Sequence, residues 1–334
     1  MKKTIAALCF AAALSCCVIP TYGRRPVRPP FLHPGDTVAI VATSYEPSDS
    51  LVAASCSLLR SWGYEPVIAP NITANPLPQY GDSTRHYAGD AAQRAEALKW
   101  ALENESVKAL LCARGGYGAI HLLDLIPRKT YRAHPKWLVG YSDVTTLHCA
   151  LNASGVMSVH AQMCGSLARK TGPDEGGLKL RDLLAGEMPG YSIPANTYNS
   201  FGSAEGVLAG GNLITMCALI GTEYDPTSGK DVILFIEEVD ESMHAIDRLF
   251  NMLLIRGRLR TIRGIVFGDF SGGSRDLPYE SVEQMLYQYT SKLGIPVCCG
   301  FPAGHGAVNM PLVLGGRVKL DVGPEGSSIS FADP

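Results

Sequence analysis

The chain has 334 residues, a formal net charge of −2 and 18% charged residues. Its 46% hydrophobic content is typical of a folded globular protein and excludes an intrinsically disordered chain. The near-neutral charge and the lack of a basic run argue against nucleic acid as a partner. The length predicts one large domain or two medium domains.

The N-terminus has the features of a secretory signal peptide, which we place at residues 1–17. Its parts follow one another in the expected order: Lys2 and Lys3, an apolar segment over 4–14, then Cys16 and Cys17. A buried first helix is the alternative, but the segment has no amphipathic period. The sequence around the Cys pair is similar to a lipoprotein cleavage site, with Cys16 or Cys17 as the lipidated residue. We expect an exported protein of the periplasm or cell envelope, attached to a membrane by this lipid.

The Pro- and Arg-rich residues 18–33 are interpreted as a tether, and an N-terminal domain is predicted over 34–165. A buried strand at 36–43 opens this domain, and polar residues 72–87 are predicted to form a loop. Further patterns alternate along the chain: strands at 64–69, 107–113 and 137–141, and helices at 50–62, 91–104, 119–125 and 143–152. This alternation predicts a parallel α/β sheet.

Residues 166–200 are rich in Gly, Pro, Asn and Ser and are interpreted as a linker. A second domain is predicted over 201–332. It has short strand patterns and fewer helices, with strands at 205–209, 232–237, 264–268, 296–299, 312–322 and 328–331. The pattern predicts a smaller, β-rich domain of different architecture.

Two segments lie where a predicted strand ends and a predicted helix begins. In the first, Gly140-Tyr141-Ser142-Asp143, a Ser stands beside helix N-terminal amides that can stabilise an oxyanion. It resembles the GxSxG elbow of hydrolases, with Val144 in place of the last Gly. A plain helix N-cap is the alternative for Ser142.

The second segment is Arg114-Gly115-Gly116-Tyr117-Gly118. Its glycines would let backbone N–H groups approach a bound anion or oxyanion closely. A dinucleotide loop is a weaker interpretation, because the GxGxxG spacing is missing. A tight turn without a ligand is the remaining alternative.

The apolar strand 232–237 ends in two carboxylates, Glu237 and Glu238. A buried acid needs a partner, and one of these could orient a His, as the acid of a catalytic triad does. A salt-bridged strand end is the alternative. Adjacent strand residues point to opposite faces, so the two are a poor glycosidase pair. His305 lies between glycines after the strand at 296–299 and is sterically free to act as a base.

Seven segments, taken together, resemble the LD-carboxypeptidases, a family of serine peptidases that includes the microcin C self-immunity peptidases. They occur in the family's order, at 34–36, 114–118, 140–143, 210–213, 236–238, 268–272 and 304–305. The resemblance implies a triad of Ser142, Glu237 and His305. It also implies oxyanion donors at the backbone amides of Asp143 and of one glycine in the Gly115–Gly116 pair.

The resemblance further implies a Rossmann- or flavodoxin-like N-terminal domain, a smaller C-terminal domain, and a site between them. The implied activity is hydrolysis of the L,D amide bond that releases the terminal D-alanine of a murein tetrapeptide, without a metal or organic cofactor. A homodimer is expected, and Arg114 is a candidate for binding the substrate carboxylate. Two alternatives remain open: a self-immunity peptidase that cleaves peptidyl-adenylates, and an inactive exported binding protein.

Overall fold

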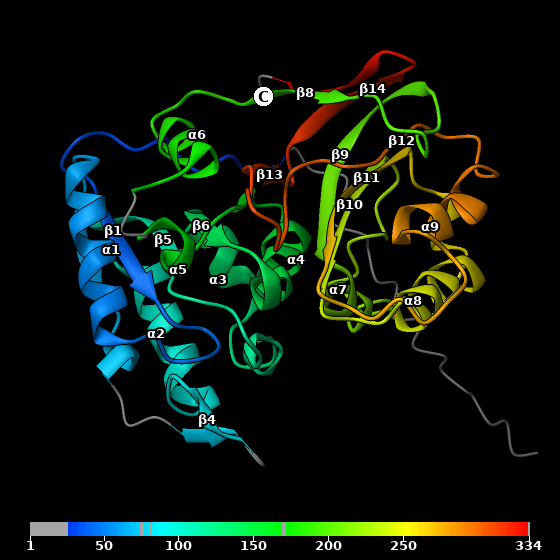
Figure 1. Ribbon diagram of the computed structural model, residues 1–334. Coiled ribbons are helices and arrows are strands. Elements are labelled where there is room, and N and C mark those ends of the chain that lie inside the picture. The colour runs from blue at the N-terminus through cyan, green and yellow to red at the C-terminus, as the bar shows by residue number, and fades with distance from the viewer. Residues whose placement is uncertain (1–25, 74–76, 80–81, 169–171, 333–334) are drawn as a thin grey trace, which may run out of the picture.

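The computed structural model describes residues 26–73, 77–79, 82–168 and 172–332, and Figure 1 shows two α/β domains side by side. The predicted signal peptide and the Cys16–Cys17 lipidation site lie outside the described residues. In the described part of the chain, no helix combines the length and the apolar character needed to cross a bilayer.

The N-terminal domain is built on a six-stranded sheet with the order β13-β7-β6-β5-β1-β2. Its strands are β1 (Thr37–Val41), β2 (Glu65–Ile68), β5 (Val107–Cys112), β6 (Trp137–Gly140), β7 (Ser158–His160) and β13 (Leu312–Leu314). All neighbours pair in parallel except β13, which is antiparallel to β7. The central strands β1, β5 and β6 are apolar and largely buried on both faces because helices cover both sides of the sheet, and the edge strand β2 is partly exposed.

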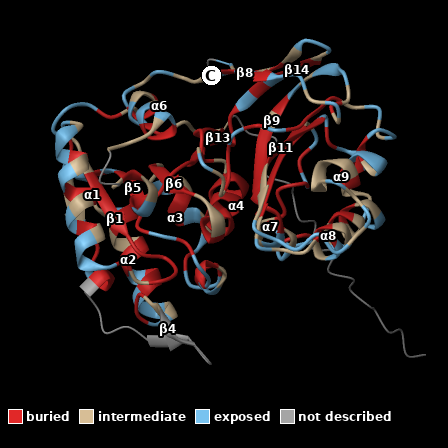
Figure 2. Ribbon diagram, viewed as in Figure 1, coloured by how far each residue is buried: buried red, intermediate tan, exposed pale blue. Residues whose placement is uncertain are grey.

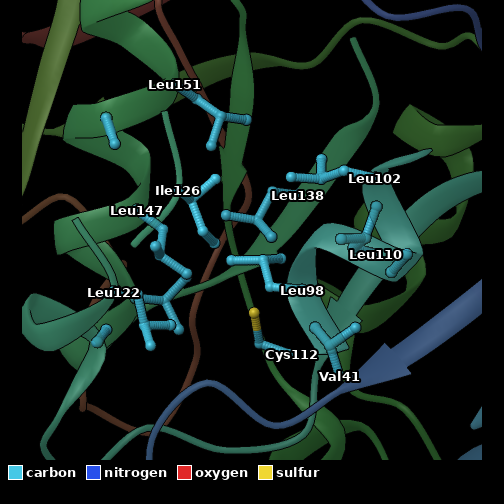
Figure 3. Close-up of a cluster of buried hydrophobic side chains, with 14 of the residues drawn as sticks. Val41, Leu98, Leu102, Leu110, Cys112, Leu122, Ile126, Leu138, Leu147 and Leu151 are labelled. Atoms are coloured by element: carbon cyan, nitrogen blue, oxygen red, sulfur yellow. The ribbon is translucent and has the colours of Figure 1, made fainter. Parts of the chain in front are cut away.

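Helices of this domain cover the sheet in two groups. They are α1 (Asp49–Ser61), α2 (Ala91–Glu103), α3 (Arg128–Ala133), α4 (Thr145–Ala153), α5 (Cys164–Leu167) and α6 (Glu175–Leu184), with short 3-10 helices η2 (Pro70–Thr73), η3 (Ala119–Leu122) and η4 (Ser142–Val144). One core lies between the sheet and α2, α4 and η3, and Figure 3 shows its side chains, including Leu98, Leu138 and Leu147. The opposite core contains residues of α1, α5 and α6.

The C-terminal domain has a seven-stranded sheet with the order β12-β11-β10-β9-β14-β15-β8. Its strands are β8 (Gly190–Pro194), β9 (Gly202–Asn212), β10 (Val232–Val239), β11 (Gly264–Ser271), β12 (Val297–Cys298), β14 (Arg317–Gly323) and β15 (Gly326–Phe331). Strands β9 to β12 pair in parallel and the others are antiparallel. The helices are α7 (Leu213–Cys217), α8 (Met243–Ile255) and α9 (Val282–Thr290), with η5 (Arg258–Arg260). The predicted fold class is confirmed.

Four local predictions differ from the structure. Within 72–87, predicted as a loop, β3 (Leu77–Gln79) and β4 (Asp82–Tyr87) form a hairpin, joined to the domain by a bridge between Tyr45 and Tyr87. The helix predicted at 119–125 is only the single 3-10 turn η3. The strand predicted at 312–322 is two strands, β13 and β14, with a turn at Gly315 between them.

The fourth difference concerns the expected linker and tether. Residues 166–200 contain α6, which buries three leucines against the N-terminal core, and β8, an edge strand of the second sheet. Residues 26–33, expected as the end of a tether, pack on the N-terminal domain. Phe31 stacks on Trp137, the Trp137 indole donates to the Pro30 carbonyl, and Leu32 is buried. In both segments, apolar contacts of a few residues outweigh a composition that is typical of a linker.

Candidate active site

Ser142 occupies a strained backbone position, separated from the end of β6 by one residue. Its φ is +64°, a left-handed conformation that a residue other than glycine rarely adopts. The extended residue before it, Tyr141, precedes the 3-10 turn, and no side-chain capping bond is made at either η4 or α4. Ser142 is therefore the sharp point of a strand–turn–helix elbow and does not act as a helix cap.

Three glycines allow the segments around Ser142 to pack closely. A Cβ on Gly115 would lie 3.1 Å from Ser142 Oγ, and one on Gly140 would lie 2.9 Å from Val144. A Cβ on Gly116 would lie 2.2 Å from the Tyr45 ring. A larger residue at Gly115 would push the loop at 114–118 away from the serine, and larger residues at Gly140 and Gly116 would displace Val144 and the Tyr45 ring.

His305 and Glu237 form a hydrogen-bonded pair in the C-terminal domain. The distance from His305 Nδ1 to Glu237 Oε2 is 2.7 Å, and the Glu237 side chain is fully buried at the carboxyl end of β10. Glu238 points to the other face, where it accepts bonds from Asn212 and from the Ile214 and Val239 amides. Only Glu237 of the two carboxylates is the partner of the imidazole.

The surroundings of His305 favour its charged form. Burial lowers the pKa of His305, but the hydrogen bond and charge of Glu237, together with Glu238 and Asp240, outweigh it, so the pKa is raised. The imidazole lies 4.8 Å from the Tyr141 ring, centroid to centroid, and is 17% exposed. This arrangement leaves Nε2 as the ring nitrogen not bonded to Glu237.

A cavity of about 440 Å³ brings the two domains' polar groups together. It is lined by residues of both domains, among them Arg114, Gly115, Gly116, Tyr141, Ser142 and His305. The structure thus places Ser142 and His305 on one cavity, with Glu237 behind the histidine. A serine, an imidazole and a buried carboxylate in this order can perform nucleophilic acyl transfer.

The side chains of Asp143 and Arg114 have different surroundings. Asp143 is buried, and its carboxylate accepts bonds from Ser44 Oγ at 2.5 Å and the Ala119 amide at 2.8 Å. Burial raises its pKa. Its side chain braces the elbow, which leaves only its backbone for a role in the cavity. Arg114 is exposed at the cavity, with its guanidinium 5.7 Å from the Tyr45 ring centroid and bonded to the Glu46 carbonyl.

Sequence reasoning did not single out three residues around the histidine. Tyr141 packs on the imidazole, Asp269 accepts from the Gly306 amide, and Asn309 accepts from the Gly304 amide. Asp269 and Tyr141 each lie within a segment named for the family resemblance, which was the available signal. Asn309 had none. Among the described residues, no group of three or more His, Cys, Asp or Glu is arranged to hold a metal ion.

Two family models match the chain. The model of the LD-carboxypeptidase N-terminal domain matches residues 38–161, and that of the LD-carboxypeptidase C-terminal domain matches residues 205–320. The two matched regions contain Ser142 and the two pair residues Glu237 and His305, respectively.

Similar proteins agree with these models. A putative carboxypeptidase of Synechocystis is 34% identical, with 87% of this chain and 93% of that protein covered. A murein tetrapeptide carboxypeptidase of Pseudomonas aeruginosa is 29% identical over 71% of this chain and 80% of that protein. The crystal structure of a muramoyltetrapeptide carboxypeptidase from Oxalobacter formigenes has a TM-score of 0.78 at 26% identity, covering 89% and 99% of the chains. A microcin C7 self-immunity protein shares the fold, with a TM-score of 0.79 at 20% identity and coverage of 91% and 98%.

Proposed function

Because the chain belongs to the LD-carboxypeptidase family, and is thus a peptidase, we propose that it is a serine carboxypeptidase that releases the terminal D-alanine of a murein tetrapeptide. The observation that carries the proposal is the cavity shared by Ser142 and His305, with the imidazole held by Glu237 at 2.7 Å. The family relatives named for murein peptides supply the substrate class.

The chemistry proceeds in two acyl-transfer steps. The Oγ of Ser142 attacks the carbonyl carbon of the scissile amide while His305 Nε2 takes the proton from this hydroxyl. Glu237 holds the imidazole in place and stabilises the imidazolium cation. The protonated His305 then gives its proton to the leaving amine of D-alanine. Water, activated by the same imidazole, breaks the acyl ester and restores Ser142. The steps use only protein groups and water.

Backbone amides at the elbow stabilise the charge that develops on the substrate oxygen. We assign this role to the amide of Asp143 and to one amide of the Gly115–Gly116 pair, which border Ser142. Their dipoles are fixed by the buried Asp143 carboxylate and by the close packing of the loop, so little reorganisation is needed at the transition state.

A carboxypeptidase must also bind the free carboxylate next to the scissile bond. Arg114 is our candidate, because its exposed guanidinium lies at the cavity that contains Ser142. A guanidinium can bind a carboxylate through two parallel hydrogen bonds, which fixes orientation as well as charge.

A paired assay tests the proposed specificity. The purified protein is incubated with three muramoyl peptides that differ only at the end: terminal D-alanine, terminal L-alanine, and D-alanine amide. We expect release from the first, and a loss of at least about 10-fold in kcat/KM for the amide, because the charge-assisted contact is removed. Equal hydrolysis of all three would contradict an LD-carboxypeptidase.

The same assay, with a peptidyl-adenylate added as a fourth substrate, separates the alternative functions. Cleavage of a peptidyl-adenylate in place of murein peptides would indicate a self-immunity peptidase. That activity would require an aromatic side chain on which the adenine of the substrate can stack. All three tryptophans lie away from the cavity lining, with Trp137 in the core and Trp62 and Trp100 packed against it. Binding without turnover of any of these peptides would indicate an exported binding protein.

We also propose that the protein is exported, carries a lipid at Cys16 or Cys17, and forms a homodimer. The signal-like N-terminus supports export, and two or more acyl chains would give stable attachment to a membrane. Membrane fractionation with intact mass analysis should find the mature chain in the membrane, without residues 1–15 if Cys16 is lipidated or without residues 1–16 if Cys17 is. A soluble protein that still carries Met1 would contradict both cleavage and anchoring.

Analytical ultracentrifugation of the detergent-solubilised protein tests the proposed homodimer.

A further inference from the structure

His305 lies in a connection that has no regular secondary structure, between β12 and β13. The residues on both sides of it are nevertheless fixed through their backbone amides. The Gly304 amide donates to Asn309 Oδ1 at 3.1 Å, and the Gly306 amide donates to Asp269 Oδ2 at 3.1 Å. The backbone is therefore held immediately before and immediately after the imidazole.

The two acceptor side chains come from well-ordered surroundings. Asp269 belongs to β11, and its own amide donates to the Ala303 carbonyl at 2.9 Å, so it contacts the connection twice. Asn309 is only 4% exposed and lies beside the fully buried ring of His160 on β7. Asp269 thus ties the connection to the second sheet, and Asn309 bonds one part of the connection to another beside His160 of the first sheet.

Steric contacts leave this arrangement little freedom. A Cβ on Gly306 would lie 2.4 Å from Asp269 Oδ2, and a Cβ on Gly304 would lie 2.9 Å from Glu237 Oε2. Gly304 also has a φ of +131°, which disfavours other residues. Gly306 therefore packs closely against Asp269, and Gly304 packs closely against Glu237, the partner of His305.

The surroundings of Asp269 disfavour its charged form. Burial raises its pKa, and the nearby charge of Glu237 raises it further, against the lowering by the Gly306 amide and by His305. The fold therefore places a second partly buried carboxylate close to Glu237, where its charge is disfavoured. An oxygen acceptor is what the Gly306 amide requires.

We propose that Asp269 and Asn309 are positioning residues of the hydrolytic reaction: by holding the amides on both sides of His305, they fix the imidazole toward Ser142 and Glu237. This inference rests on the proposed function. A histidine displaced by an ångström loses proton transfer to Ser142, while the rest of the substrate site is unchanged.

The test compares Asp269→Ala, Asp269→Asn and Asn309→Ala with the wild type. The asparagine keeps an oxygen for the Gly306 amide and removes the charge. We expect Asp269→Ala and Asn309→Ala each to lower kcat on the murein tetrapeptide by about 10- to 100-fold with KM unchanged, and Asp269→Asn to stay within about threefold of the wild type.

Asn199→Ala is the matched control. Asn199 is also buried in this domain, and its Oδ1 accepts from the Cys299 amide at 2.8 Å, at the other end of the same connection. It should lower the unfolding temperature without lowering kcat. If Asp269→Ala does not fold, as judged by circular dichroism, Asn309→Ala carries the test from the other side of His305.

A second readout separates this inference from the proposed function. A fluorophosphonate reacts with a serine that its histidine activates, and it needs no murein substrate. Failure of the wild type to be labelled at Ser142 would refute the serine mechanism itself. Labelling at the wild-type rate in Asp269→Ala and Asn309→Ala would overturn the positioning role, and so would an Asp269→Asn variant as slow as Asp269→Ala.

Discussion

At the scale of single residues, two strained backbone positions border the site. Ser142 and Asp240 are the non-glycine residues with positive φ in the described part of the chain, at 64° and 61°. Asp240 directly follows β10, which carries Glu237, and Ser142 follows β6 after one intervening residue, Tyr141. Such strain persists only where the surroundings fix it, and here it turns the chain sharply at the ends of the two strands that supply the serine and the acid.

The raised pKa of His305 predicts opposite pH trends for activity and stability. Activity needs the neutral imidazole, so kcat/KM should rise with pH through a pKa above the ordinary value of 6.5. The folded pKa is raised, so the stabilisation from the His305–Glu237 pair is fully present below pH 6.5 and is lost as the pH rises through the folded pKa.

The measurement is a pH series of kcat/KM and of urea unfolding. His305→Gln serves as the control and should remove this part of the stability change. An activity profile with its midpoint below 6.5, or a His305→Gln variant whose unfolding free energy changes with pH as in the wild type, would contradict the prediction.

At the scale of elements, the sequence predicted what local patterns encode. The alternating apolar runs identified strands β1, β2, β5, β6, β10 and β11 close to their observed bounds, and helices α1 and α2 likewise. It did not predict α6 and β8, whose apolar residues lie in a Gly- and Pro-rich stretch. They are fixed by long-range contacts, such as the pairing of β8 with β15 near the C-terminus.

In the candidate site, too, the sequence predicted residues in recognisable local segments and missed residues that act through contacts in space. Ser142, Glu237 and His305 were predicted because each lies in a short segment of recognisable composition. Asp269 and Asn309 were not, because their role depends on spatial neighbours: the partner of Asp269 is an amide 37 residues later in the chain. A hydrogen bond of this kind leaves no pattern in the residues around either member.

His148 links helix α4 to two strands. Its Nε2 lies 2.8 Å from the Gly140 carbonyl, to which it must donate, so Nδ1 accepts from Ser158 Oγ at 2.9 Å. Burial lowers the pKa of His148 to about 4, only partly offset by the bond to Gly140. The neutral ring therefore anchors the helix that follows the Ser142 elbow.

This lowered pKa predicts a loss of stability in acid. Between pH 6.5 and about 4 the unfolded chain takes up the proton first, so the unfolding free energy falls as the pH falls, by about 3 kcal/mol for this group. Urea unfolding at a series of pH values measures the slope, and His148→Gln should flatten it. Equal slopes in the variant and the wild type would contradict the prediction.

At the scale of the whole molecule, one short strand belongs to both domains. Strand β13 follows the second domain's β12 in sequence, yet pairs with β7 of the first sheet, and the residues after it bond to β9 of the second. Its side chains alternate accordingly: Val313 lies in a core of the N-terminal domain, and Leu312 and Leu314 lie in a core of the C-terminal domain. Strand β13 therefore joins the cores of the two domains.

A shared strand predicts that the two domains unfold together. Leu314→Ala, in the C-terminal core, should lower the unfolding free energy by about 2–5 kcal/mol, as buried leucine truncations do. All three tryptophans lie in the N-terminal half, so their fluorescence reports that domain alone. We expect fluorescence and circular dichroism to give one coincident transition, shifted equally by Leu314→Ala. A fluorescence transition unmoved by the substitution would show that the domains unfold independently.

The central claim is that Ser142 is the nucleophile of a carboxypeptidase site. The most direct measurement is the release of D-alanine from muramoyl tetrapeptide by the Ser142→Ala variant, compared with the wild type at equal concentration and with matched unfolding temperatures. The predicted result is a fall in kcat of roughly 10³-fold or more, with the fold intact, because the variant lacks the hydroxyl that forms the acyl ester. A folded Ser142→Ala protein that keeps substantial activity would contradict the claim.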